Sequence, residues 1–92
     1  GRVDALPLGN GATLVVWLEG TGQTTAEWRA RRIGADGVAS RSWTLAPSLK
    51  ARQAGFARLA RAGEDILFAY RDPTEQGGVR VLRVAMPSPA RR

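Results

Sequence analysis

One pattern occurs twice in this chain: a short apolar run with an aromatic residue, then a polar loop, then a run that carries arginines. The first apolar run is LVVWLEG at residues 14–20, and the second is ILFAYRD at residues 66–72. The arginine-bearing runs are AEWRARRIG from Ala26 and GVRVLRVA from Gly78. Runs of this length between turn residues are typical of β-strands. The repeat therefore predicts two copies of one β-hairpin.

Alternating side chains predict the strand that completes the first hairpin and a further strand after it. Residues 26–33 alternate between apolar and charged side chains, which is the period of a strand with one buried face. The charged positions are Glu27, Arg29 and Arg31. This charged face has two interpretations: an anion-binding site, or solvent-facing charges paired across strands. Residues 38–46 alternate as well, and we expect Pro47 to end that strand.

The N-terminal segments predict two more features of the sheet. Leu14–Leu18 is apolar without interruption, which is typical of a strand covered on both faces. Ala5–Leu8 is a short apolar piece that contains Pro7 and therefore suits an edge strand. Turns are predicted at the dipeptides Asn10-Gly11 and Asp36-Gly37.

Residues 48–62 allow two interpretations. Ser48 could cap a helix that ends near Gly63, but Gly55 in its middle costs about 1 kcal/mol. The end of the segment also alternates like a strand. The repeat favours a strand from about Gly55, after an extended loop, because this strand gives Ile66–Tyr70 a partner.

The strand order predicts an all-β fold made of antiparallel four-stranded meander blades of a β-propeller, about two blades in all. Residues 1–47 form the first blade, residues 48–86 a second and incomplete blade that ends with strand Val79–Ala85, and residues 87–92 a flexible tail. Two blades cannot close a ring, because each sheet face needs a neighbour. Either the chain is the C-terminal part of a longer propeller, or copies assemble, three of them giving six blades.

The residue types limit the chemistry. The 92 residues suffice for one domain and include no cysteine and no histidine, so thiolate or imidazole metal sites and histidine-based triads are excluded. The net charge is +6, but the arginines are spread along the chain without a clustered basic face, which disfavours nucleic acid as a partner. No apolar run approaches the roughly 20 residues of a membrane span. We expect no metal and no cofactor.

Several stretches together resemble a known family. The runs VVWLEG and AEWRARRIGADG, followed by GFARLARAGEDILFAYRD and VRVLRVAM, resemble the sialidase-like, six-bladed Asp-box (BNR-repeat) propellers of bacteria. The Asp-box is present in a degraded form, with Asp36-Gly37 at the turn and Trp43 after it. The resemblance implies an extracytoplasmic protein, periplasmic or secreted. The arginine triad, nucleophilic tyrosine and acid/base aspartate of such sialidases do not map onto positions here, so we assign no catalytic residue.

A second resemblance concerns TGQTTAEW, residues 21–28, which is similar to a segment of small fucose-binding lectins built from two-blade chains that trimerise. Glu27 and Trp28 match the sugar-binding Glu-Trp pair of those lectins, whereas Val16 stands where their arginine is expected. The candidate carbohydrate-binding residues are Glu27, Trp28, Arg29, Trp43, Tyr70 and Arg71.

These observations lead to three function hypotheses, of which the third, a small basic β-domain that binds nucleic acid, ranks last. The first is a part of a sialidase-like propeller that binds or scaffolds, with the remaining blades or further copies of the chain as partners. The second is a self-assembling two-blade lectin with a carbohydrate ligand. Catalysis by this chain is disfavoured. If the chain is part of a longer protein and that protein is an enzyme, the resemblance implies a glycoside hydrolase of sialidase type. The carboxylates considered for acid/base roles are Glu19, Glu27, Asp36, Asp65 and Asp72.

Overall fold

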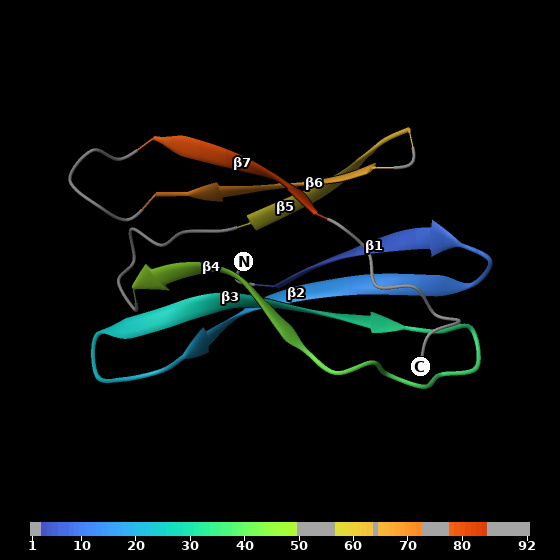
Figure 1. Ribbon diagram of the computed structural model, residues 1–92, viewed down its shortest axis with the longest axis horizontal. Helices are drawn as coiled ribbons and strands as arrows, with labels where there is room; N and C mark the ends of the chain where they lie inside the picture. The colour runs from blue at the N-terminus through green and yellow to red at the C-terminus, as the bar shows by residue number, and fades with distance from the viewer. Residues whose placement is uncertain (1–2, 50–56, 64, 73–77, 85–92) are drawn as a thin grey trace.

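The computed structural model describes residues 3–49, 57–63, 65–72 and 78–84, and these form seven strands in two antiparallel sheets (Figure 1). The first sheet has the order β1-β2-β3-β4 and the second has the order β5-β6-β7, so neighbours in the chain are neighbours in each sheet. The first sheet comprises β1 (Val3–Gly9), β2 (Ala12–Gly20), β3 (Thr25–Ile33) and β4 (Trp43–Leu49). The second comprises β5 (Ala57–Ala62), β6 (Asp65–Arg71) and β7 (Val79–Val84). The predicted all-β antiparallel meander is confirmed.

Two predicted turns are present in the first sheet. Asn10 (φ 53°) and Gly11 (φ 80°) connect β1 to β2 with the positive φ values that an Asn-Gly turn supplies. After β3, the amide of Gly37 donates to the carbonyl of Gly34 at 2.9 Å, and the Asp36 carboxylate accepts from the amide of Val38 at 2.9 Å. Asp36 therefore serves the turn itself.

Both predicted bounds of the fourth strand, its start at residue 38 and its end before Pro47, are wrong. β4 begins at Trp43 and runs through Pro47 to Leu49, with Pro47 opposite Glu27. β4 is an edge of its sheet, where a residue without an N–H can sit with its missing donor pointing outward. A bulge leaves Leu45 between the pairs Trp28–Ala46 and Arg29–Thr44, so the alternation of the strand shifts at this point.

The prediction that β2 is covered on both faces is also wrong within the described part of the chain. Leu14 and Val16 are fully buried, whereas Val15 and Trp17 are only partly buried. The reason is that the four-stranded sheet packs with one face on the second sheet, and no described segment covers its other face.

Strand β5 decides between the two interpretations of residues 48–62. Ala57–Ala62 pairs with β6 along its whole length, so the helix is wrong for these residues, while residues 50–56 lie outside the described residues. Gly63, which directly follows β5, has φ 67°. The tail at 87–92 and Ala85 also lie outside the described residues. No described residue is helical, and so none belongs to a helix that could cross a bilayer.

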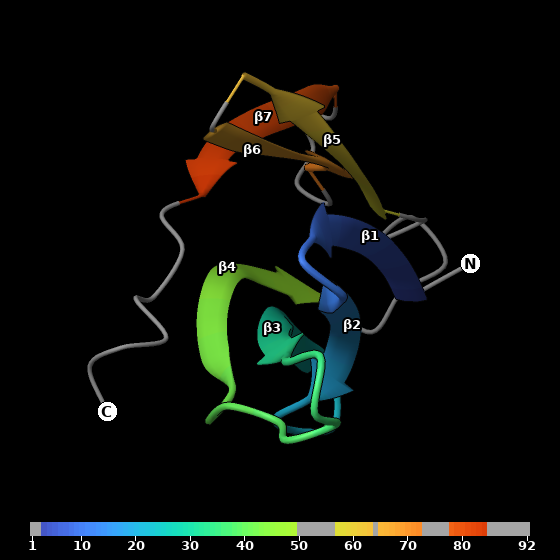
Figure 2. The same cartoon turned by 90° about the vertical axis from the view of Figure 1, so that its right-hand side faces the viewer.

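The core lies between the two sheets, which pack face to face (Figure 2). Trp28 and Phe68 are both fully buried there, with ring centroids 5.7 Å apart at an interplanar angle of 68°. At one side of the core β1 runs beside β5, where the amide of Leu59 donates to the Asp4 carboxylate at 2.8 Å and Arg61 donates to the carbonyl of Leu8 at 2.8 Å. The two sheets therefore share one hydrophobic core.

Candidate functional site

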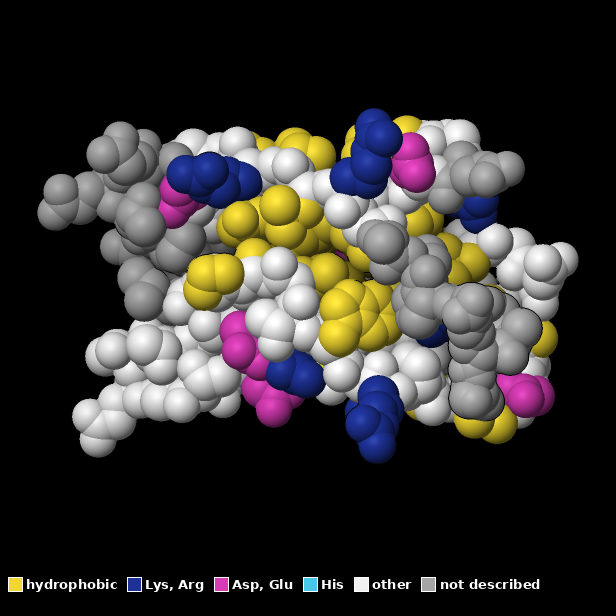
Figure 3. Space-filling model, in the orientation of Figure 1, with side chains coloured by type: hydrophobic (Ala, Val, Ile, Leu, Met, Phe, Trp, Pro, Cys, Tyr) yellow, Lys and Arg dark blue, Asp and Glu magenta, His cyan; other side chains and the backbone are white. Residues whose placement is uncertain are grey.

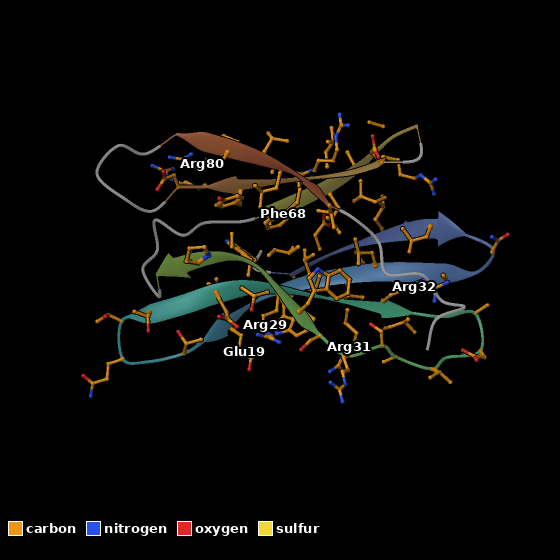
Figure 4. All side chains as sticks on the ribbon, viewed as in Figure 1. Glu19, Arg29, Arg31, Arg32, Phe68 and Arg80 are labelled. Carbon is orange, nitrogen blue, oxygen red and sulfur yellow. The ribbon has the colours of Figure 1, made fainter. Side chains whose placement is uncertain are left out.

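The face of the four-stranded sheet that points away from β5–β7 carries a group of charged side chains, among them Glu19, Arg29 and Arg31 (Figure 4). Register places Trp17 opposite Arg29 and Glu19 opposite Glu27 on this face. In the space-filling view, acidic and basic side chains adjoin one another on this lower part of the molecule (Figure 3). We call it the outer polar face and define it by Trp17, Glu19, Glu27, Arg29, Arg31, Ser42 and Thr44.

Arg29 is the centre of a hydrogen-bonded network. Its Nη1 donates to Glu27 and to Thr44 Oγ1, the latter at 3.0 Å, and its Nη2 donates to Ser42 Oγ at 2.8 Å. Thr44 also donates to Glu27 Oε2 at 3.0 Å. The hydrogen bond from Arg29, followed by that from Thr44, lowers the pKa of Glu27 below its ordinary value. Glu27 is therefore held as a carboxylate and is unsuited to act as a general acid near neutral pH.

Trp17 forms the second part of the outer polar face. Its indole Nε1 donates to Glu19 Oε1 at 2.9 Å, and the guanidinium carbon of Arg31 lies 5.9 Å from the ring centroid. The ring is partly exposed. A flat apolar ring bordered by a carboxylate and guanidinium groups can contact both the apolar face and the hydroxyls of a polar ring-shaped ligand.

The six predicted carbohydrate-binding residues do not form one site. Only Glu27 and Arg29 come together, on the outer polar face. Trp28, between them in β3, is 0% exposed and points into the core, because successive side chains of a strand point to opposite faces. Its ring therefore offers no surface to a sugar in this conformation.

The other three predicted residues are elsewhere. Trp43 is partly buried and packs against the core. Tyr70 is 8% exposed and stacks on Phe68, with centroids 5.2 Å apart. Arg71 is exposed at the end of β6 on the other sheet.

Sequence reasoning missed Trp17 and Glu19 as members of this face. The loop between two strands fixes which residues face each other, and here Gly20 lies opposite Ala26, which sets Trp17 opposite Arg29. Sequence alone could not give this register, because a turn confined to residues 21–24 would have set Trp17 opposite Trp28 instead. The alternation of β3 had already grouped Arg29 with Arg31 on one face.

The carboxylates considered for acid/base roles all have structural contacts. Glu19 accepts from Trp17, Glu27 from Arg29 and Thr44, and Asp36 from the backbone of its own turn. On the second sheet, Asp72 pairs with Arg80 at 2.8 Å and Asp65 with Arg83 at 3.2 Å. The bond to Asp72 raises the pKa of Arg80. Among the residues that the structure describes, no group of three histidine, cysteine or acidic side chains could hold a metal ion.

Comparison with known proteins returns no match: no family model, no curated protein and no solved structure is significantly similar to the chain. The class that the fold and the outer polar face define is therefore a small all-β protein of two stacked antiparallel sheets.

Proposed function

We propose that this chain supplies two neighbouring blades of a larger, sialidase-like β-propeller and works as a binding or scaffolding portion of it, without complete catalytic machinery of its own. The two meander sheets packed face to face, with their first strands β1 and β5 side by side, support this arrangement. The remaining blades come from the rest of a longer protein or from further copies of the chain.

The observation that carries the proposal is a pair of exposed valines on the outward face of the second sheet, which no described segment covers. On the face of β5–β7 that points away from the core, register aligns Ala69 with Val81 and Arg71 with Val79. Val79 is 73% exposed and Val81 is 58% exposed. Exposed valines on a sheet face are costly in water, and a neighbouring sheet would cover them.

The contacts of the carboxylates support a binding role over catalysis. A catalytic acid or base needs a group free to exchange a proton with the substrate. Glu27, the carboxylate held most firmly on the outer polar face, is instead kept ionised by Arg29 and Thr44. The face thus offers fixed charges and an aromatic ring, which suit recognition.

The test places a charge on the outward face of the second sheet, beside the exposed valines. Ala69 lies on the middle strand of the second sheet, on this outward face, and Ala69→Arg would block a neighbouring sheet. We expect the unmodified chain to bind a hydrophobic dye such as ANS, or to self-associate in light scattering. Ala69→Arg should reduce either signal severalfold. Ala39→Arg, which adds the same charge at an exposed position after the Asp36 turn, is the matched control.

A chain that stays a monomer, binds no dye and unfolds cooperatively would count against the proposal, because its faces would need no neighbour. An equal effect of Ala69→Arg and Ala39→Arg would also count against it, since the effect would then come from charge alone.

A second candidate function is a self-assembling two-blade lectin, favoured by the pairing of Trp17 with Glu19 and Arg31. Ring stacking on a ligand contributes about 1 kcal/mol or more, so Trp17→Ala should weaken glycan affinity by about tenfold. Val15→Ala, two residues away on the same face, is the control. The measurement is binding to a glycan array, and no glycan bound by the unmodified chain removes this candidate.

A further inference from the structure

The two sheets have four edges, and three of them are closed to another strand. β1 contains Pro7, and β4 contains Pro47 next to a bulge. Proline on an edge removes a backbone donor and discourages the addition of a strand. β5 is covered by β1, with the Leu59 amide already donating to Asp4.

The edge of β7 has none of these protections. Val79–Val84 contains no proline, pairs regularly with β6 on one side, and meets no described strand on the other. Its two arginines do not block the edge by charge, since Arg80 pairs with Asp72 and Arg83 pairs with Asp65. An exposed, regular edge of this kind is a template for pairing with another chain.

We propose that β7 pairs with β7 of a second copy, antiparallel and centred on Val81, so that the two three-stranded sheets form one continuous six-stranded sheet. A twofold axis makes such an interface self-complementary. The partner is a second copy because the sequence of β7 matches itself in one register, as the side-chain pattern shows.

The register follows from the faces and charges of β7. A shift by one residue would set outward side chains opposite inward ones, which continuity of the two sheet faces forbids. Centring the pair on Arg80 would set Arg80 opposite its own copy, and like charges directly opposite are destabilising. Centring it on Leu82 would leave Val79 outside the paired segment.

Centring on Val81 keeps the two sheet faces continuous and sets no two arginines directly opposite each other. Val79 then lies opposite Arg83 of the second copy, and Val81 opposite its own copy. Because Val81 is in register with Ala69 on β6, an apolar row would run from Ala69 through both copies of Val81 to the second Ala69. This pairing sets the valines that are 73% and 58% exposed in the single chain beside side chains of the second copy, while the sheet face itself stays open.

The pairing does not depend on the proposed propeller, because it uses the edge of the sheet, whereas the propeller uses its faces. If the blades of a longer protein supply a strand to β7, the self-pairing fails while the propeller stands. If the chain forms no propeller, the self-pairing can still occur.

The absence of native cysteine makes a site-specific cross-link the sharpest test. Residues directly opposite in antiparallel strands have Cβ atoms about 4.5–5.5 Å apart, close enough for a disulfide after small adjustment. We expect Val81→Cys in the full chain to form a covalent dimer under mild oxidation with diamide at least tenfold faster than Val3→Cys. Val3 is the matched control, since it is also an exposed edge valine, at 62%.

Equal rates for the two variants would overturn the proposal, and so would faster cross-linking of Leu82→Cys than of Val81→Cys. A second measurement needs no cysteine. By sedimentation, the unmodified chain should show a concentration-dependent doubling of mass, and Val81→Lys should shift that transition to at least tenfold higher concentration while keeping the β-sheet circular dichroism. A sedimentation mass of the unmodified chain that stays constant across the concentration range would also overturn the proposal.

Discussion

The indole of Trp28 in β3 meets the ring of Phe68 in β6 edge to face, with centroids 5.7 Å apart, and so joins the middle of one sheet to the middle of the other. Both side chains are fully buried. Trp28 belongs to the arginine-bearing run of the first copy of the repeat and Phe68 to the apolar run of the second, so the two rings occupy different positions of the repeat. The contact explains why the two sheets form one core.

Removal of the ring at Phe68 should destabilise the core strongly. Phe68→Ala removes the partner of Trp28 and the stacking partner of Tyr70, and such truncations cost about 3–5 kcal/mol. Val79→Ala, on an exposed side chain of the same sheet, should change stability by less than about 0.5 kcal/mol. Urea unfolding measures both. Similar losses for the two variants would contradict a shared core centred on Phe68.

Asp4 should hold the two sheets together at the β1–β5 side. Asp4→Leu leaves the Leu59 amide without its acceptor and should cost about 1–3 kcal/mol, while Asp4→Asn keeps an acceptor and should cost less. The specific measurement is hydrogen exchange at the Leu59 amide, which should accelerate in Asp4→Leu more than at amides in the middle of β2. Unchanged protection at Leu59 would show that the bond contributes nothing.

Gly11 should tolerate a side chain less well than Gly9. Both have positive φ, at 80° and 87°, so alanine at either position carries a backbone cost of about 1 kcal/mol. A Cβ on Gly11 would also lie 2.8 Å from Cβ of Ala35, whereas a Cβ on Gly9 meets nothing within 4 Å. Thermal unfolding should therefore give a lower melting temperature for Gly11→Ala than for Gly9→Ala, and adding Ala35→Gly to Gly11→Ala should remove most of this difference. Equal melting temperatures would rule out the contact.

The Glu27–Arg29 pair predicts a dependence of stability on pH. The pKa of Glu27 is lowered in the folded chain, so its contribution to stability is present above the ordinary value of 4.5 and is lost as pH falls through the folded value. Glu27→Gln should be less stable than the unmodified chain at pH 7, and the gap should narrow below pH 4.5. Thermal melts across this range give the gap, and NMR titration of the Glu27 carboxyl gives the pKa directly. A gap that stays constant with pH would contradict the assignment.

Much of the fold could be predicted from local sequence because strands and turns are local. The alternation of Ala26, Trp28 and Ala30 with charged residues predicted the buried face of β3, and the repeat correctly selected a strand at Ala57–Ala62 over a helix. The end of β4 was misjudged since Pro47 is a breaker only where its missing N–H is needed, and edge position is a property of the sheet.

The candidate site was predicted less well. The resemblance to fucose-binding lectins predicted that Glu27 and Trp28 act together, but these neighbours in sequence lie on opposite faces of β3. The alternation of β3 sets Glu27 and Arg29 on one face, and the register of β2 with β3 sets Trp17 opposite Arg29 from another strand.

By itself, the sequence determined the period of each strand, the turns at Asn10-Gly11 and Asp36-Gly37, and the two-part repeat, because these depend on residues close together in the chain. Only the tertiary structure decided that the two sheets bury their apolar faces against each other, which edges stay open, and which charges meet on the outer polar face. Those features depend on pairing and packing between segments far apart in sequence, and the free energy of burial that selects them is shared across both sheets.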